Sequence, residues 1–264
     1  MKFKYVLVLI VCVLVPFYAL AQMLWLQGVQ AKKRQMQMQA PTPDPFVTNG
    51  LVGWWKLDDG SGTSVIDSTG TTNTGTLLGS PTWTAGRVGA SAIQLSGTNQ
   101  YVNIPRADAF DLSGAAITLA LWIKTPGAVS DGFSDAVASR DSITTGSRVF
   151  LLQHTASNSK LAFYCWNTAN TNISPAESNA AISDNAWHHV AAAYNGTNLL
   201  LYVDGGQQTV KGVLTGNLKT SMSIPFRIGH VNTNDLRYFR GSVDDIRIYN
   251  RVLTQDEIDT LAAQ

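Results

Sequence analysis

The sequence predicts an all-β protein whose main domain is an antiparallel β-sandwich. Charged residues make up 14% of its 264 residues, against roughly 25% in typical soluble domains. From Leu51 onward, short apolar runs alternate with Gly, Asn, Asp and Ser, the spacing of antiparallel strands and turns. Between Leu51 and Thr254, no helical periodicity is sustained. These observations favour strands over helices through most of the chain.

Each predicted strand is a short apolar or alternating run bounded by turn residues. The clearest hairpin has Asn195-Gly196 between two such runs. Thr254 and Glu257 form a capping box that predicts a short C-terminal helix. Cys165, in mid-strand, is expected to be a small buried hydrophobic residue. The predicted strands are 51–57, 91–96, 100–104, 116–124, 148–154, 160–166, 187–194, 198–203, 224–229 and 240–249.

Residues 1–26 predict an N-terminal hydrophobic helix that is either a signal peptide or a membrane anchor. Two lysines precede the apolar run, and Ala19-Leu20-Ala21 matches a signal-peptidase site, with cleavage before Gln22. The apolar stretch over residues 5–26 is also about 20 residues long, enough to span a bilayer. Both alternatives therefore stay open.

Residues 27–48 are expected to form a linker, and residues 49–264 the folded domain. The linker begins with a polar segment and ends in Pro41-Thr42-Pro43-Asp44-Pro45, which excludes a helix. The domain holds 14 Lys and Arg against 17 Asp and Glu, without a basic run. Nucleic-acid binding is therefore not expected.

Five blocks resemble the laminin G-like, concanavalin A-like jelly-roll family. NAWHHVAAAYNGTNLLLYVDGG (185–206) is similar to its W-H-V-A…Y-V-D-G hairpin, and FRGSVDDIRIYNRVLTQDEI (239–258) to its closing strand and final helix. Segments 51–77, 88–105 and 117–126 resemble its opening segment and next two blocks, in order. The resemblance covers about residues 49–262. It implies an antiparallel jelly-roll β-sandwich.

Asp244 leads to a predicted calcium site. Strict alternation in strand 240–249 places its side chain on the face of Ile246 and Ile248. A carboxylate buried there needs a cation, an arginine or backbone N–H groups as its partner. The resemblance implies that the first and last strands are neighbours, which brings Asp58 near Asp244.

Asp67 and the carbonyl of Gly60 lie on the loop that follows, and oxygen ligands of this kind suit Ca²⁺. Members of this family often carry one structural Ca²⁺, so we expect one at Asp58, Gly60, Asp67 and Asp244. The alternative is that Asp244 accepts hydrogen bonds from backbone amides, while Asp58 only solvates a loop.

The carboxylates give little support for catalysis. Glycanases of this fold carry E-x-D-x-x-E on a strand, whereas this chain has only Glu177, in a predicted loop, and Glu257, in the capping box. Asp244 and Asp245 are adjacent, and alternation would send them to opposite faces. The same argument separates His188 from His189. No catalytic residue is expected, and the protein is not expected to be an enzyme.

Residues 161–166 predict a ligand-binding surface. If Leu161, Phe163 and Cys165 face the core, Tyr164 and Trp166 lie on the opposite surface of that sheet. Arg148 and Asn167 supply hydrogen-bond donors nearby in sequence. The alternative is that the two aromatic side chains pack under a loop. The predicted ligand residues are Tyr164, Trp166, Arg148 and Asn167.

The leading functional prediction is an exported, non-catalytic recognition or adhesion module, secreted or on the cell surface, with a glycan or cell-surface polymer as partner. The alternative is a structural subunit of a surface layer or filament that self-assembles through its N-terminal segment. Retention of residues 1–26, with membrane contact through residues 5–26, would favour the structural subunit. Cleavage before Gln22 would favour the secreted recognition module.

Overall fold

The computed structural model describes residues 47–71, 73–105, 116–127, 134–142, 147–169, 174–219, 224–231 and 236–264, with isolated residues 22, 27 and 114. The predicted N-terminal helix and most of the linker lie outside these ranges. The described domain belongs to a compact unit spanning Asp44–Gln264. None of the helices in the described ranges is long and apolar enough to cross a membrane.

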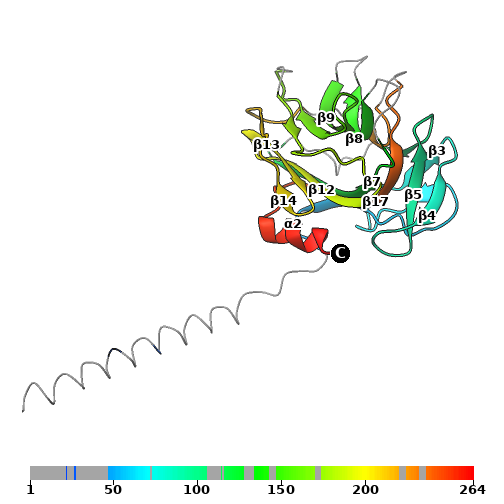
Figure 1. The fold of residues 1–264 in the computed structure, drawn as a ribbon, viewed down its shortest axis with the longest axis horizontal. Helices are drawn as coiled ribbons and strands as arrows, with labels where there is room; N and C mark the ends of the chain where they lie inside the picture. Colours follow the sequence, from blue (N-terminus) through cyan, green and yellow to red (C-terminus); the bar gives the residue numbers. More distant parts are fainter. Residues whose placement is uncertain are drawn as a thin grey trace, which may run out of the picture. The chain divides into compact units, whose positions relative to one another are not determined.

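The domain is a sandwich of two antiparallel sheets with one short helix, α2, which confirms the predicted fold class (Figure 1). In the described residues, the first sheet, sheet A, has the order β14-β13-β12-β7-β17-β5-β4, with β1 on β17 and β15 on β13. Its strands are β1 (Leu51–Trp55), β4 (Thr82–Ala85), β5 (Ser91–Ser96), β7 (Ile117–Lys124), β12 (Trp187–Tyr194), β13 (Asn198–Val203), β14 (Gly206–Gln207), β15 (Gly212–Val213) and β17 (Arg240–Tyr249).

The second sheet, sheet B, has the order β11-β10-β9-β8-β16-β6-β3-β2 in the described part of the chain. Short strands at both ends leave little unpaired backbone at its edges. Its strands are β2 (Ser64–Val65), β3 (Gly75–Leu78), β6 (Tyr101–Ile104), β8 (Asp135–Ser142), β9 (Ser147–His154), β10 (Leu161–Cys165), β11 (Ala176–Glu177) and β16 (Phe226–Ile228).

The hydrophobic core fills the space between the sheets. Leu199 and Leu201 of β13 point into it, as their alternation predicts. Leu161, Phe163 and Cys165 of β10 do the same, and Cys165 is a buried free thiol whose pKa burial raises well above its usual value. The predicted faces of both strands are therefore confirmed.

The last strand, β17, holds sheet A together. Along one edge it pairs with β7, and along the other with β5 and then β1. A β-bulge lies between Asp244 and Arg247, where Asp245 has a φ of 45°. The extra residue shifts the alternation, so Ile246 and Ile248 face the core while Asp244 pairs with Trp122 on the outer face. The prediction that Asp244 shares a face with the two isoleucines is wrong for this reason.

Helix α2 (Gln255–Ala262) covers part of the outer face of sheet A (Figure 1). The predicted capping box is present: the Thr254 hydroxyl accepts from the Glu257 N–H, and the Glu257 carboxylate accepts from the Thr254 N–H. Ile258 and Leu261 pack against Ala191, Ala193 and Tyr249. The helix thereby forms one wall of the pocket described below.

Candidate functional site

Three of the predicted ligand residues, Tyr164, Trp166 and Arg148, lie together on the outer face of sheet B. Tyr164 and Trp166 stack with ring centroids 6.0 Å apart and an interplanar angle of 15°. They pack on Ala136, Leu151 and Val231. Tyr164 is half-buried, whereas Trp166 is only 7% exposed. The predicted face is confirmed, but Trp166 is not the open platform that alternation alone suggested.

Contacts within the protein occupy the two predicted polar residues. The Arg148 guanidinium lies 3.8 Å from the centroid of the Trp166 ring and donates two hydrogen bonds, of 2.9 and 2.8 Å, to the buried carboxylate of Asp141. The Asn167 side chain donates to the Thr215 carbonyl at 3.0 Å. The structure therefore brings Tyr164, Trp166 and Arg148 together as a packed cluster, whereas the Asn167 side chain is bonded to the segment of Thr215.

A second aromatic group lies on the same outer face, formed by residues that are far apart in sequence. His230 and Tyr238 stack with centroids 4.0 Å apart, and Tyr101 lies 5.2 Å from His230. The Arg227 guanidinium lies 4.9 Å from the Tyr101 ring. These residues come from β6, β16 and the segment before β17. From the sequence, only the outward direction of the Tyr101 and Arg227 side chains could have been predicted, because it follows from the alternation of apolar residues in β6 and β16.

Two of the predicted calcium ligands hold one loop by hydrogen bonds. Asp244 Oδ2 accepts from the amides of Arg87 and Val88 at 2.7 and 2.9 Å. Asp58 Oδ1 accepts from the amides of Ala90 and Ser91 at 2.6 and 3.2 Å. Backbone N–H groups, one of the partners considered for Asp244, thus satisfy these oxygens.

Asp67 belongs to a separate network. Its carboxylate accepts from the amides of Trp54 and Thr69 and from the side chains of Thr69, Thr71 and Asn73. These donors lower the pKa of Asp67, although burial opposes the shift. Within the described ranges, no three His, Cys, Asp or Glu side chains are arranged to hold a metal ion. Calcium binding at Asp58, Gly60, Asp67 and Asp244 stays a prediction.

If calcium binds at these residues, excess EDTA should lower the thermal unfolding temperature and added Ca²⁺ should restore it. Differential scanning fluorimetry measures both shifts. An unfolding temperature that EDTA leaves unchanged would exclude the predicted calcium site and leave the hydrogen bonds from backbone amides as the partners of Asp58 and Asp244.

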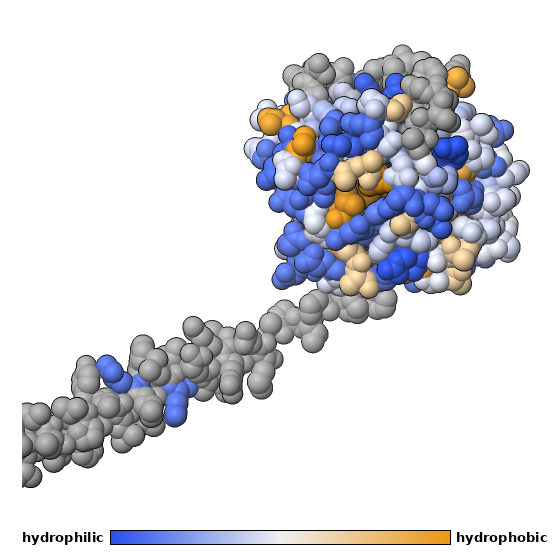
Figure 2. All heavy atoms as spheres, in the orientation of Figure 1, coloured by the Kyte–Doolittle hydropathy of each residue, from blue (hydrophilic) through white to orange (hydrophobic). Residues whose placement is uncertain are grey.

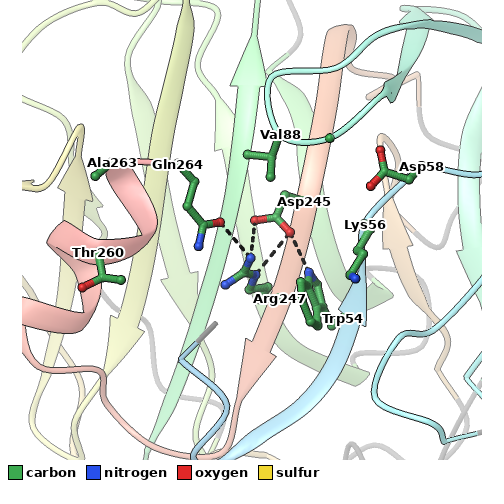
Figure 3. A pocket seen from close by; sticks show the side chains of 10 residues that line it. Trp54, Lys56, Asp58, Val88, Asp245, Arg247, Thr260, Ala263 and Gln264 are labelled. Atoms are coloured by element: carbon green, nitrogen blue, oxygen red, sulfur yellow. Dashed lines mark hydrogen bonds and ion pairs between the residues drawn. The ribbon is translucent and has the colours of Figure 1, made fainter. Parts of the chain in front are cut away.

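A pocket of about 360 Å³ opens on the outer face of sheet A, between β1, the Val88–Gly89 segment and the end of α2 (Figure 3). Trp54 and Arg247, which are cross-strand partners, form its floor. Gly89 has a φ of +71°, and a Cβ there would lie 2.3 Å from the Asp58 carboxylate oxygens, so this wall requires glycine. The lining residues are Trp54, Lys56, Asp58, Val88, Gly89, Asp245, Arg247, Thr260, Ala263 and Gln264.

An ion pair fixes the floor of this pocket. Asp245 Oδ1 accepts from the Trp54 indole N–H at 2.6 Å and from Arg247 Nε at 3.2 Å, and Asp245 Oδ2 lies 2.9 Å from an Arg247 terminal nitrogen. The Arg247 guanidinium also donates to Gln264 Oε1 at 2.9 Å, as Figure 3 shows. Lys56 Nζ and the Arg247 guanidinium lie 4.4 and 4.5 Å from the centroid of the Trp54 ring. The floor is therefore preorganised, and the exposed Lys56 covers part of its indole.

The adjacent carboxylates of Asp244 and Asp245 lie on one face of sheet A rather than on opposite faces, because the bulge cancels their alternation. Burial raises the pKa of Asp244 to about 7, while its amide donors oppose the shift. Asp244 is fully buried, and Asp245 is paired with Arg247. Asp244 and Asp245 therefore do not form the pair of accessible carboxylates that glycoside hydrolysis uses.

The surface of the described domain is mostly polar in the view of Figure 2, where hydrophobic residues form small separate groups among hydrophilic ones.

Two antiparallel sheets, a closing central strand and a short terminal helix define a lectin-like jelly-roll sandwich. A family model described as the concanavalin A-like lectin/glucanases superfamily matches residues 96–259, more than half of the chain, and the protein belongs to this family. No curated protein sequence matches the chain.

Several solved structures have a similar fold. The binding domain of Paraclostridial Mosquitocidal Protein 1 is 14% identical, with a TM-score of 0.65 over 81% of this chain and 52% of that one. Domain 4 of AbnA, a GH43 extracellular arabinanase from Geobacillus stearothermophilus, was solved in complex with arabinotriose. It is 20% identical, with a TM-score of 0.58 over 80% of this chain and 98% of that one. The binding domain of Botulinum Neurotoxin DC in complex with SialylT is 13% identical, with a TM-score of 0.64 over 81% of this chain and 51% of that one. The chain spans about half the length of the two toxin domains.

Proposed function

We propose that the domain is a non-catalytic carbohydrate-binding module that holds one or two neutral sugar units in the Trp54 pocket. The observation that carries the proposal is the pocket itself, a preformed cavity with an indole on its floor and a few polar groups at its rim. Its volume of about 360 Å³ falls in the range of small-molecule sites, which are mostly apolar with a few placed polar groups.

The rim suits hydroxyl groups. Lys56 and Thr260 supply donors, and Asp58 has a second carboxylate oxygen beside the one that holds the Ala90 and Ser91 amides. A sugar ring would take the place of Lys56 over the Trp54 indole. An exposed cation–π contact is worth only about 0.5–1 kcal/mol, so displacing Lys56 costs little. The arabinotriose complex of the similar domain of AbnA supports carbohydrate as the ligand class.

A substitution that fills the pocket tests the proposal. Ala263 is exposed at the end of α2 and lines the pocket, so Ala263→Trp should occupy the cavity without removing a core contact. We expect binding to neutral oligosaccharides to weaken roughly tenfold or more, as measured by glycan array and isothermal titration calorimetry. Arabino-oligosaccharides belong in the panel.

Asp256→Trp is the matched control, because Asp256 is exposed on the same helix and does not line the pocket. This variant should bind like the wild type. Equal binding by Ala263→Trp and wild type would remove the pocket from consideration. A wild-type domain that binds no oligosaccharide of a broad panel would refute the function.

We also propose that the module is exported, on the basis of the N-terminal apolar segment and its Ala19-Leu20-Ala21 site. Intact mass of the protein from its native source separates the alternatives. A mature chain beginning at Gln22 supports a secreted binder. A chain that keeps residues 1–26 supports an anchored protein or an assembled surface subunit.

A further inference from the structure

Arg227, at the centre of the second aromatic group on sheet B, is half-buried and has no anionic partner among the described residues. Its Nε donates to Asn103 Oδ1 at 3.2 Å, and one terminal nitrogen donates to the Val231 carbonyl at 3.0 Å and lies 3.3 Å from His230 Nδ1. Its remaining terminal nitrogen has no acceptor, and no carboxylate pairs with it, among the residues that the structure describes.

Three other arginines of the domain have a carboxylate partner. Arg247 pairs with Asp245, Arg148 with Asp141, and Arg251 with Glu257. Each of these carboxylates lies within 3 Å of its guanidinium. Burying a cation without an anion costs free energy. Desolvation accordingly lowers the pKa of Arg227 from its usual value. An anion from outside the protein would relieve this cost.

The surroundings of Arg227 favour an anion that carries a ring. Tyr101 and Tyr238 are half-buried, so each keeps part of its ring open to solvent beside the guanidinium. Their rings lie 6.4 Å apart, with His230 packed against both. The stacked Tyr164 and Trp166 lie farther along the same sheet, joined to this group through Val231, which packs with Trp166 and accepts from Arg227. A chain of linked rings fits such a row of aromatic side chains.

We infer that Arg227 binds the carboxylate of an acidic sugar unit, such as a uronic acid, whose ring lies against Tyr101 and Tyr238. This inference rests on the proposed carbohydrate-binding function and adds a second site, on the opposite sheet from the Trp54 pocket. The planar guanidinium suits a carboxylate because it donates two parallel hydrogen bonds.

The test compares oligogalacturonates with the same oligosaccharides after their carboxylates have been reduced to alcohols. We expect the wild type to bind the acidic form, more weakly at high salt, and the reduced form at least roughly tenfold more weakly. Arg227→Gln should lose the preference for the acidic form, and Arg227→Lys should keep only part of it, because lysine lacks the planar fork. Thermal unfolding of each variant shows whether the domain is intact.

Arg87→Gln is the matched control. Arg87 also lies over an aromatic ring, 4.3 Å from the centroid of Trp122, but on sheet A. This variant should bind oligogalacturonates like the wild type.

The two sites are distinguishable by their variants. Loss of acidic-glycan binding in Arg227→Gln but not in Ala263→Trp supports the inference. Unchanged binding in Arg227→Gln, or equal binding of the reduced ligand, overturns it and leaves the pocket proposal standing. Arg227-dependent binding of polyglutamate but of no acidic oligosaccharide overturns the sugar assignment. Arg227-dependent binding of oligogalacturonates by a domain that ignores all neutral glycans supports this site and refutes the pocket.

Discussion

Replacing Asp245 with asparagine is expected to lower the free energy of unfolding by about 3 kcal/mol, because the change removes the carboxylate that pairs with the buried Arg247 guanidinium. Arg247 is 1% exposed and Asp245 4% exposed, so water compensates neither charge. The carboxylate also accepts from the Trp54 indole at 2.6 Å. Asparagine keeps the side-chain shape and tolerates the positive φ of this position. Urea unfolding followed by tryptophan fluorescence measures the loss.

A double variant separates the ion pair from general packing. Adding Arg247→Met to Asp245→Asn removes the uncompensated charge, so the double variant should be more stable than Asp245→Asn alone. Asp256→Ala, at an exposed position of α2, should change the free energy of unfolding by less than about 1 kcal/mol. A double variant that is less stable than the single variant would show that the pair contributes packing rather than charge compensation.

Acidification is expected to destabilise the domain through His189. Burial and the charge of Arg247 lower the pKa of His189 from 6.5 to about 3 in the folded state, although Asp204 opposes the shift. The ring packs edge-on against Trp122, and its Nδ1 is buried without a partner in the described structure. In the unfolded chain the histidine has its ordinary pKa. Below about pH 6.5 the unfolded state therefore takes up a proton that the folded state does not.

The domain therefore loses stability as the pH falls below about 6.5. The stability that neutral His189 contributes is complete above about pH 6.5 and is lost as the pH falls toward 3, by about 1.4 kcal/mol per pH unit. At pH 4.5 the expected loss is about 3 kcal/mol. His189→Phe keeps an aromatic ring against Trp122 and does not titrate, so its stability should fall less between pH 6.5 and 4.5. His188, whose partners Asp204 and Asp184 raise its pKa, is common to both proteins. If the free energy of unfolding fell equally with pH in the wild type and in His189→Phe, His189 would be excluded as the source of acid sensitivity.

Sequence periodicity predicted the fold because most of the long strands carry apolar side chains on a regular face. Strand β8 was missed, since its sequence DAVASRDS places small and charged residues where an apolar run was sought. Strands β2 and β11 are two residues long, too short to have a pattern. The bulge at Asp245 was also invisible, because an aspartate at positive φ has no distinct sequence signature. It changed the face assigned to Asp244 and, with it, the geometry of the predicted calcium site.

The candidate sites were harder to predict than the fold. The predicted cluster around Tyr164 does assemble, but the Arg148 guanidinium covers Trp166, and alternation carries no information about such stacking. The Trp54 pocket combines β1, β17, the Val88–Gly89 segment and α2, which are far apart in sequence. Arg227 is one of many arginines in sequence. It stands out only once the structure shows that it is half-buried and has no carboxylate partner among the described residues.

The position of β17 has a consequence for how the domain folds. This strand joins β7 on one edge to β5 and β1 on the other, so sheet A depends on pairings between residues near 51 and residues near 249. Such distant contacts give a high contact order, and proteins of this kind fold in milliseconds to seconds rather than microseconds. Until β17 is in place, β7, β5 and β1 present unpaired edges, which invite aggregation. Folding of sheet A should therefore be concerted and late, with β17 as the step that commits the chain.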